Sequence, residues 1–247
     1  MKALKNIGST IKGLFSPEQN VSTTQMSLTF FLTISLILAN IMVVKSIDLF
    51  GIPQLANTCS IITFPITYIL SDVFSEVYGY KWSRITATWA FIGTALCSAF
   101  FAIMIALPGN AAWDKQDQLI NILGNTPQIA IASIVAFWFG DFANDKVFQL
   151  MKKKNGSEKL FGLRAILSSL VGKYVDGFIF TFLGLSFLPL ETKIIMVINC
   201  PFVQILLETA LLPVTHLVMK KVKKVEQKHK EEKEAEQLKA LEEAKVE

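Results

Sequence analysis

The chain has 247 residues, of which 52% are hydrophobic and only 18% are charged. Soluble domains carry about a quarter charged residues, so this composition argues against a soluble globular protein. The formal net charge of +4 resides in short loops and the two terminal regions, which favours acidic membrane lipids over nucleic acid as partners.

A polar, basic leader precedes the first apolar run. Residues 1–26 contain three lysines and an amphipathic pattern, which predicts either a short helix on the membrane surface or an unstructured leader. The first apolar run lacks the small-residue cleavage site of a signal peptide.

Six apolar segments follow, each long enough to cross a bilayer at about 1.5 Å of rise per residue. They cover residues 27–47, 58–79, 85–107, 126–151, 165–188 and 193–219. We therefore expect an all-α polytopic membrane protein with a six-helix transmembrane domain over residues 27–219. Residues 220–247 are rich in Lys, Glu and Ala, with opposite charges four positions apart, which predicts a charged helical tail in the cytoplasm.

Basic residues are unevenly divided between the two sides of these segments. One side, with the leader and the tail up to Lys230, carries sixteen lysines and arginines, whereas the other side has only Lys115 and Lys193. The positive-inside rule then places both termini in the cytoplasm. We expect a multi-pass protein of the inner (cytoplasmic) membrane.

The second segment carries a polar stripe. Tyr68, Asp72 and Glu76 follow one another at steps of four residues and therefore share one face of a helix. A carboxylate at mid-membrane costs roughly 3 kcal/mol on insertion scales, so we expect this face to border a polar cavity that holds a solute. For Glu76 the alternative is a salt bridge to Lys81 or Arg84.

Polar residues also occur in the first and fourth segments. Asn40 is predicted to hydrogen-bond to another helix, whereas Lys45 either contributes to the site or extends to the outer surface. Asp141 and Asn144 are three residues apart and share a face, with Trp138 on the same side.

The fifth and sixth segments complete the candidate site. Ser169, Lys173 and Asp176 form one stripe, with Phe180 one turn further. A Lys173–Asp176 pair whose charges only neutralise each other is the alternative. Segment six adds Glu208, four residues after a glutamine.

Acidic residues outnumber basic ones within the segments by six to three. Pairing accounts for three acids, and nearby arginines for one or two more, so at least one acid remains for a proton, water or a cation. This surplus favours a solute rich in hydrogen-bond donors, or a proton-coupled step, over an anionic substrate.

The motifs of an intramembrane enzyme are missing from the sequence. It contains no HExxH or GxSxG motif, and its three cysteines lack zinc-site spacing. We expect a transporter without catalytic residues, cofactor or metal. An assembly protein stays an alternative, although it would not explain so many acids on cavity-facing stripes.

Several blocks of the sequence resemble the queuosine-precursor transporter family, small six-helix proteins also grouped with vitamin-uptake transporters. The blocks are NIMVVK, PITYILSDVFSEVYGYKWSR, FGDFAND, RAILSSLVGKYVDGFIF and ETALLPVTH, of which TYILSDVFSEVYGY is the most specific. The resemblance implies import of a 7-deazaguanine base: the cyano or aminomethyl precursor of queuosine, or queuine. It also implies a fold similar to the substrate-binding subunits of energy-coupling-factor transporters. Family members are thought to work without the ATPase module; a subunit of a multi-component importer, an energising partner and a homo-oligomer stay open.

The resemblance also implies which residues form the site. Matching positions are Asn40, Lys45, Asp72, Glu76, Gly79, Arg84, Asp141, Asn144, Arg164, Ser169, Asp176, Phe180 and Glu208. Asp141 stands where the family pattern has Glu, and Lys173 where an acid or amide is commoner, and both bear on substrate choice.

The chemistry of a deazaguanine fits these residues. Its adjacent N–H and amino groups suit a bidentate carboxylate, for which we expect Asp72 or Glu76 together with Asp176. We expect Asn144 or Asn40 at the carbonyl. The ring would stack on an aromatic side chain from the set Tyr68, Phe180 and Trp138.

Overall fold

The computed structural model describes residues 21–154 and 161–243, so most of the predicted leader and the end of the tail lie outside the described residues. The described chain is almost entirely helical, with one small hairpin. The elements are α2 (Thr23–Met42), β1 (Ser46–Asp48), η1 (Leu49–Gly51), η2 (Pro53–Leu55), β2 (Ala56–Thr58), η3 (Cys59–Ile62), α3 (Phe64–Val73), η4 (Phe74–Tyr78), α4 (Gly79–Ala106), α5 (Gln116–Leu123), α6 (Thr126–Lys154), α7 (Phe161–Gly184) and α8 (Leu190–Glu243).

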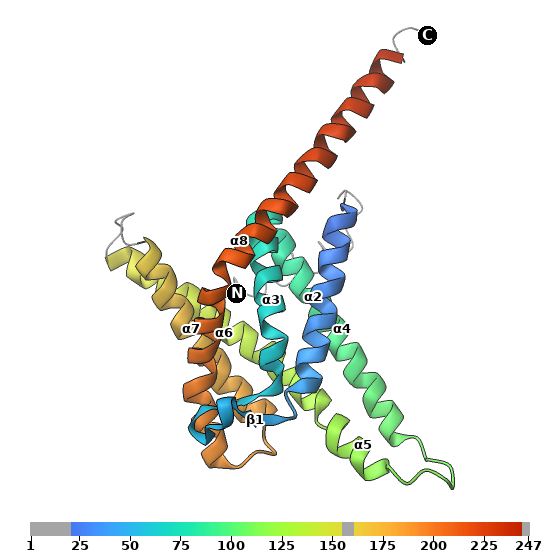
Figure 1. Cartoon of the computed structure of the whole chain (residues 1–247), viewed down its shortest axis with the longest axis vertical. Coiled ribbons are helices and arrows are strands. Elements are labelled where there is room, and N and C mark those ends of the chain that lie inside the picture. The colour runs from blue at the N-terminus through green and yellow to red at the C-terminus, as the bar shows by residue number, and fades with distance from the viewer. Residues whose placement is uncertain (1–20, 155–160, 244–247) are drawn as a thin grey trace.

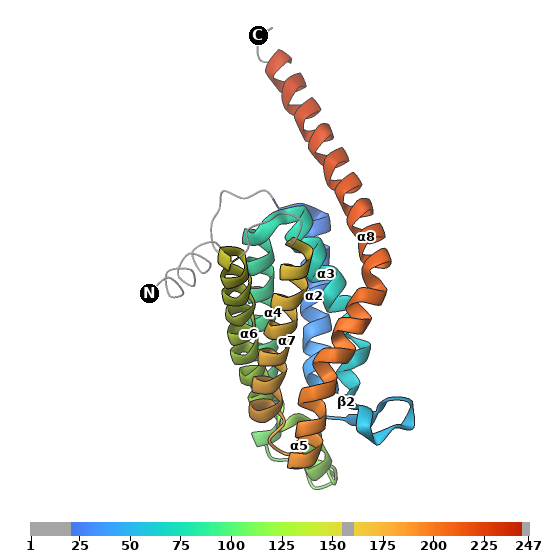
Figure 2. The ribbon, with the colours of Figure 1, turned by 90° about the vertical axis from the view of Figure 1, so that its left-hand side faces the viewer.

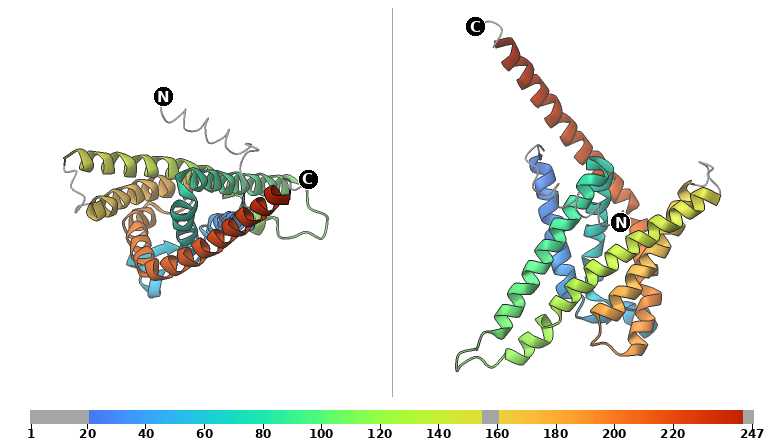
Figure 3. Two further views of the ribbon diagram at one scale, coloured as in Figure 1. Left: turned by 90° about the horizontal axis from the view of Figure 1, so that it is seen from above. Right: turned by 180° about the vertical axis from the view of Figure 1, so that it is seen from behind.

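The long helices form a bundle with the hairpin and α5 at one end and the projecting part of α8 at the other (Figures 1 and 2). Seen along the bundle, α3 lies between a wall that contains α4 and α6 and the opposite side formed by α8 (Figure 3). Each of these helices contacts a neighbour along the bundle, most extensively α6 with α7. The all-α architecture of the prediction is confirmed.

Five stretches of the described chain are long and apolar enough to cross a membrane: Thr23–Met42, Phe64–Ala106, Gln116–Met151, Ile166–Gly184 and Leu190–Glu232. The second of these joins α3, the π-helical turn η4 and α4. The backbone of Gly79 at this junction has φ 81° and ψ 170°, a conformation that favours glycine. There the chain turns, and α4 runs back along the bundle (Figure 1). The predicted count of six crossings stays a prediction.

The first predicted segment, 27–47, extends too far. Helix α2 ends at Met42, and the chain then forms the antiparallel pair β1–β2, in which Ser46 lies opposite Thr58. The turn between the strands includes Phe50 and Gly51, with φ of 57° and 73°. The apolar composition of this region hid the hairpin, because hydropathy alone does not distinguish an apolar turn from the end of a helix.

Helices α6 and α7 approach closely at Gly140 and Gly172. A Cβ atom on Gly140 would lie 2.9 Å from the carbonyl oxygen of Gly172, and a Cβ on Gly172 would lie 2.9 Å from the Cβ of Asn144. Small residues allow this approach, as is common where helices pack in membranes. The contact sets Asn144 of α6 beside the face of α7 that carries Asp176.

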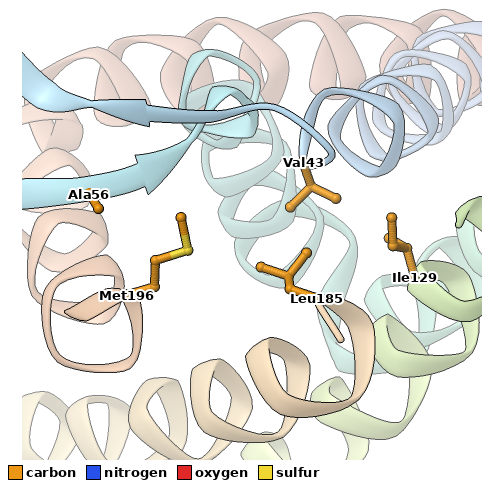
Figure 4. Close-up of a cluster of buried hydrophobic side chains, with 5 residues drawn as sticks. All are labelled: Val43, Ala56, Ile129, Leu185 and Met196. Carbon is orange, nitrogen blue, oxygen red and sulfur yellow. The ribbon is translucent and has the colours of Figure 1, made fainter. Parts of the chain in front are cut away.

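A cluster of buried apolar residues closes the bundle beside the hairpin. The side chains of Val43, Ala56, Ile129, Leu185 and Met196 come from five different segments and point toward one another (Figure 4). This cluster fixes the ends of α2, α7 and α8 relative to β2. Three of its members also line the cavity described below, so the cluster forms the floor of that cavity.

Helix α8 is the longest element, with 54 residues. It joins the sixth predicted segment, 193–219, to the predicted tail without a break, and contains Pro201 and Pro213. Proline inside a helix removes one backbone hydrogen bond and allows a bend. Helix α8 thus continues through the predicted tail as far as Glu243.

Candidate functional site

A cavity of about 500 Å³ lies in the middle of the bundle. This volume is within the usual range of small-molecule sites, about 300–1,000 Å³. Its walls come from α2, the hairpin, α3, α6, α7 and α8. Its polar lining residues include Asn40, Asn57, Tyr68, Asp72, Ser133, Asp141, Asn144, Ser169, Lys173, Asp176 and Gln204.

Three of the acids within the bundle are neutralised by basic residues. Arg84 of α4 forms an ion pair and hydrogen bond with Asp141 of α6, and Lys173 of α7 forms one with Glu208 of α8. A third pair, between Glu76 and Lys223, has an N–O distance of 2.7 Å and is more exposed. Each pair joins two different helices.

Two carboxylates in the cavity have no such partner. Asp72 of α3 and Asp176 of α7 both line it, and neither forms an ion pair or hydrogen bond with residues 21–154 or 161–243. Asp141 also lines the cavity, but Arg84 occupies its carboxylate. Asp72 and Asp176 are therefore the acceptors that this part of the chain leaves free for a ligand.

Two amide groups at the cavity supply donors. Asn40 is buried and accepts a hydrogen bond at Oδ1 from the Ser133 hydroxyl at 2.9 Å, as predicted for a contact with another helix. The Nδ2 atoms of Asn40 and Asn57 are buried and have no acceptor within the described ranges. A buried donor without an acceptor costs about 1–3 kcal/mol, so both amides favour a ligand that presents a carbonyl or ring nitrogen.

Aromatic rings form part of the cavity wall. Tyr68 stacks on Phe64 with ring centroids 5.9 Å apart and an interplanar angle of 14°. The Nζ atom of Lys173 lies 4.4 Å from the centre of the Tyr68 ring, and the same atom forms the ion pair with Glu208. Phe180 and Phe137 also face the cavity. The site thus combines flat apolar surfaces with hydrogen-bonding groups.

Eight of the eleven predicted site residues line this cavity: Asn40, Tyr68, Asp72, Asp141, Asn144, Ser169, Asp176 and Phe180. They come from α2, α3, α6 and α7, and the polar faces of these helices border the same cavity. Their contact with a ligand stays a prediction.

Three predicted residues lie outside the lining of this cavity. Lys45, which the family resemblance placed in the site, is exposed and follows the end of α2 at Met42, as in the alternative that it extends to the surface. Glu76 pairs with Lys223 instead of Lys81 or Arg84, and Glu208 pairs with Lys173. The Lys173–Asp176 pair considered as an alternative does not form.

Other cavity residues were missing from the predicted set. Gln204 and Lys173 belong to the same stripes as Glu208 and Asp176, so helical periodicity could have found both. Trp138, considered for stacking, is exposed and outside the lining, whereas its neighbour Phe137 lies in it. Asn57 lies on β2 and follows no helical pattern, so no signal in the sequence indicated it.

Comparison with known proteins gives the family. The family described as "Putative vitamin uptake transporter" matches residues 58–218. The chain belongs to this family of transporters. A curated relative from Bacillus subtilis (strain 168), named "Probable queuosine precursor transporter", is 31% identical over 165 residues, which are 65% of this chain and 70% of that protein. No solved structure matches the chain.

The match to the vitamin uptake transporter family includes most of the cavity. Asp72, Asp141, Asn144 and Asp176 all lie within residues 58–218, whereas Asn40 precedes the matched region. The family and the relative are described as transporters, not enzymes, in agreement with the expectation from the sequence. The chain is thus a polytopic membrane transporter.

Proposed function

We propose that this transporter imports a 7-deazaguanine base, a queuosine precursor or queuine, across the cytoplasmic membrane. The proposal rests on which polar groups of the cavity lack a partner. Among residues 21–154 and 161–243, the carboxylates of Asp72 and Asp176 have no donor, and the Nδ2 groups of Asn40 and Asn57 have no acceptor. The curated relative, which is named as a probable queuosine precursor transporter, supports the same solute class.

The cavity's groups suit the two edges of such a base. A carboxylate accepts the ring N–H and the adjacent amino group together, and charge-assisted hydrogen bonds of this kind contribute about 1.5–3 kcal/mol each. The Nδ2 groups of Asn40 and Asn57 donate to the carbonyl. Tyr68 and Phe180 sandwich or flank the ring. An aminomethyl substituent would interact with the second carboxylate.

We also propose the orientation and the number of crossings. The excess of lysine and arginine on the side of the tail supports cytoplasmic termini in the inner membrane. Counting α3–η4 and α4 as separate crossings, because the chain turns at Gly79, gives six. A six-helix bundle around a central solute site supports a fold similar to the substrate-binding subunits of energy-coupling-factor transporters.

Uptake of radiolabelled base by cells unable to make queuosine tests the proposal. We expect Asp72→Asn and Asp176→Asn to abolish uptake, because an amide places a donor against the donor edge of the base. Asp145→Asn is the matched control, since Asp145 is exposed and outside the cavity. Normal uptake by both cavity variants, at equal membrane expression, would refute the assignment.

A competition series then resolves the solute. The cyano base, the aminomethyl base, queuine and an anionic vitamin are each added in excess over the labelled base. We expect only the deazaguanines to compete. Competition by the anionic vitamin alone would move the function toward vitamin uptake, and co-purification with an ATPase would make the chain a subunit of a larger importer.

A further inference from the structure

A second cavity adjoins the first. It has a volume of about 500 Å³ and lies between the α3–η4 segment and the part of α8 that leads into the tail. One wall includes Asp72, Ser75 and Glu76, and the other is a stripe of α8 between Leu212 and Lys223. Asp72 lines both cavities.

One helical stripe connects the two cavities. Tyr68 lines the first cavity, Asp72 lines both, and Glu76 lines the second. Each step of four residues rises by about 6 Å, roughly the width of a small ring. A solute that moves toward the tail end of the bundle therefore exchanges one hydrogen-bonding group of this stripe for the next.

The second cavity is bridged at its tail end by contacts from α8. Lys223 donates to Glu76 at 2.7 Å, and both residues line the cavity. Three residues further along α8, the Glu226 carboxylate accepts hydrogen bonds from the Tyr78 hydroxyl at 2.8 Å and from the Ser22 hydroxyl. These three contacts, which we call the α8 latch, fasten α8 to η4 and to the start of α2.

The helix that carries the latch can bend close to the second cavity. Pro213 interrupts the backbone hydrogen bonds of α8 within the lining stretch from Leu212 to Lys223. Glu76 and Lys223 are more than half exposed, so water screens the ion pair between them. The Glu76–Lys223 contact of the latch is therefore weak enough to open and close during transport.

We propose that the second cavity is a release site for the transported solute. The α8 latch keeps this site closed and must open before the solute can leave. This proposal rests on the proposed function. When Lys223 leaves Glu76, Asp72 and Glu76 become a pair of free carboxylates one turn apart. They accept the same donor-rich edge of a planar base that Asp72 and Asp176 accept in the first cavity.

A reducible cross-link across the latch tests the release site. We would make Ser22→Cys/Glu226→Cys, which leaves Glu76 and Lys223 intact, and join the two thiols with a short bis-methanethiosulfonate reagent. Tyr78→Cys/Glu226→Cys, which also leaves Glu76 and Lys223 intact, provides a second pair that joins α8 to η4. The matched control is Lys228→Cys/Glu232→Cys, because these residues form an i,i+4 ion pair within α8 alone. Treating the wild-type protein with the same reagent shows whether its reaction with the three natural cysteines alters import.

We expect the cross-link at either latch pair to stop import of the labelled base and a reducing agent to restore it. Equilibrium binding of the base to the cross-linked, detergent-solubilised protein should persist, because the first cavity is untouched. The control pair should import normally after treatment. Unchanged import with both latch pairs cross-linked would overturn the release site. Failure of the untreated wild-type protein to bind or import the base would instead refute the proposed function.

Discussion

Replacing Gly140 with alanine tests whether the site depends on the close approach of α6 and α7. The new Cβ would lie 2.8 Å from the Cβ of Asp176 and 2.9 Å from the carbonyl oxygen of Gly172, whereas ordinary contacts begin at 3.4 Å. Because backbone atoms are involved, the two helices must separate by about 0.6 Å, the difference between 3.4 and 2.8 Å. That shift moves Asp176, one of the two free carboxylates, relative to Asp72.

Two opposing effects set the size of the change. Overpacking of this kind costs about 1–3 kcal/mol. Alanine in place of glycine within a helix recovers up to about 1 kcal/mol. We therefore expect Gly140→Ala to lower the free energy of unfolding by about 1–2 kcal/mol, from the balance of these two effects. We also expect the Kd for the base to rise about tenfold, equivalent to about 1.4 kcal/mol.

Thermal unfolding in detergent and equilibrium binding of the labelled base measure the two effects. Val171→Ile is the control, because it adds one carbon beside Gly172 at a position that is 38% exposed. It should leave stability and binding unchanged. This expectation would be refuted if Gly140→Ala, like the control, bound the base with wild-type affinity and unfolded at the wild-type temperature. The contact between α6 and α7 would then not determine the geometry of the site.

Two further predictions concern single groups of the site. Arg84→Gln leaves Asp141 without its cation and should lower the free energy of unfolding by about 1–3 kcal/mol. Adding Asp141→Asn should recover most of that loss in thermal unfolding, and a purely additive double variant would contradict the pairing. Asn40→Leu removes a donor that has no acceptor among the described residues, which offsets loss of the hydrogen bond from the Ser133 hydroxyl to Asn40 Oδ1. It should leave the empty protein within about 1 kcal/mol of wild type but weaken binding of the base at least about tenfold. Unchanged affinity would exclude Asn40 from the site.

The sequence alone predicted the faces of the helices that border the cavity. Spacing of three and four residues placed Tyr68 with Asp72, and Ser169 with Asp176, on common stripes, and both pairs line the cavity. This succeeds because periodicity is a local property of a helix. It does not fix where a helix ends, and the predicted segment 27–47 therefore extends past the end of α2 at Met42.

The partners of the charged residues could not be predicted from spacing. Glu76 pairs with Lys223, which is far along the chain, although two basic residues lie much closer in sequence. Lys173 pairs with Glu208 of α8 and not with Asp176, which lies on the same helix as Lys173. These choices depend on how α3, α7 and α8 pack, and a single sequence carries no direct record of that packing. Asn57 was missed for the same reason, since the hairpin brings it to the cavity.

Pairing across helices supports the proposed preference of the site for a donor-rich solute. Arg84 and Lys173 neutralise one acid each beside the cavity, and so leave Asp72 and Asp176 as like charges within one space of about 500 Å³. Because both carboxylates border the same cavity, we expect it to favour a ligand that brings N–H groups or a cation to them. An anion would add a third negative charge to the same space. In the proposed function the salt bridges thus set the charge preference of the cavity. Tyr68 would add preference for a flat ring, and the Asn40 amide, unpaired among the described residues, would add preference for a carbonyl.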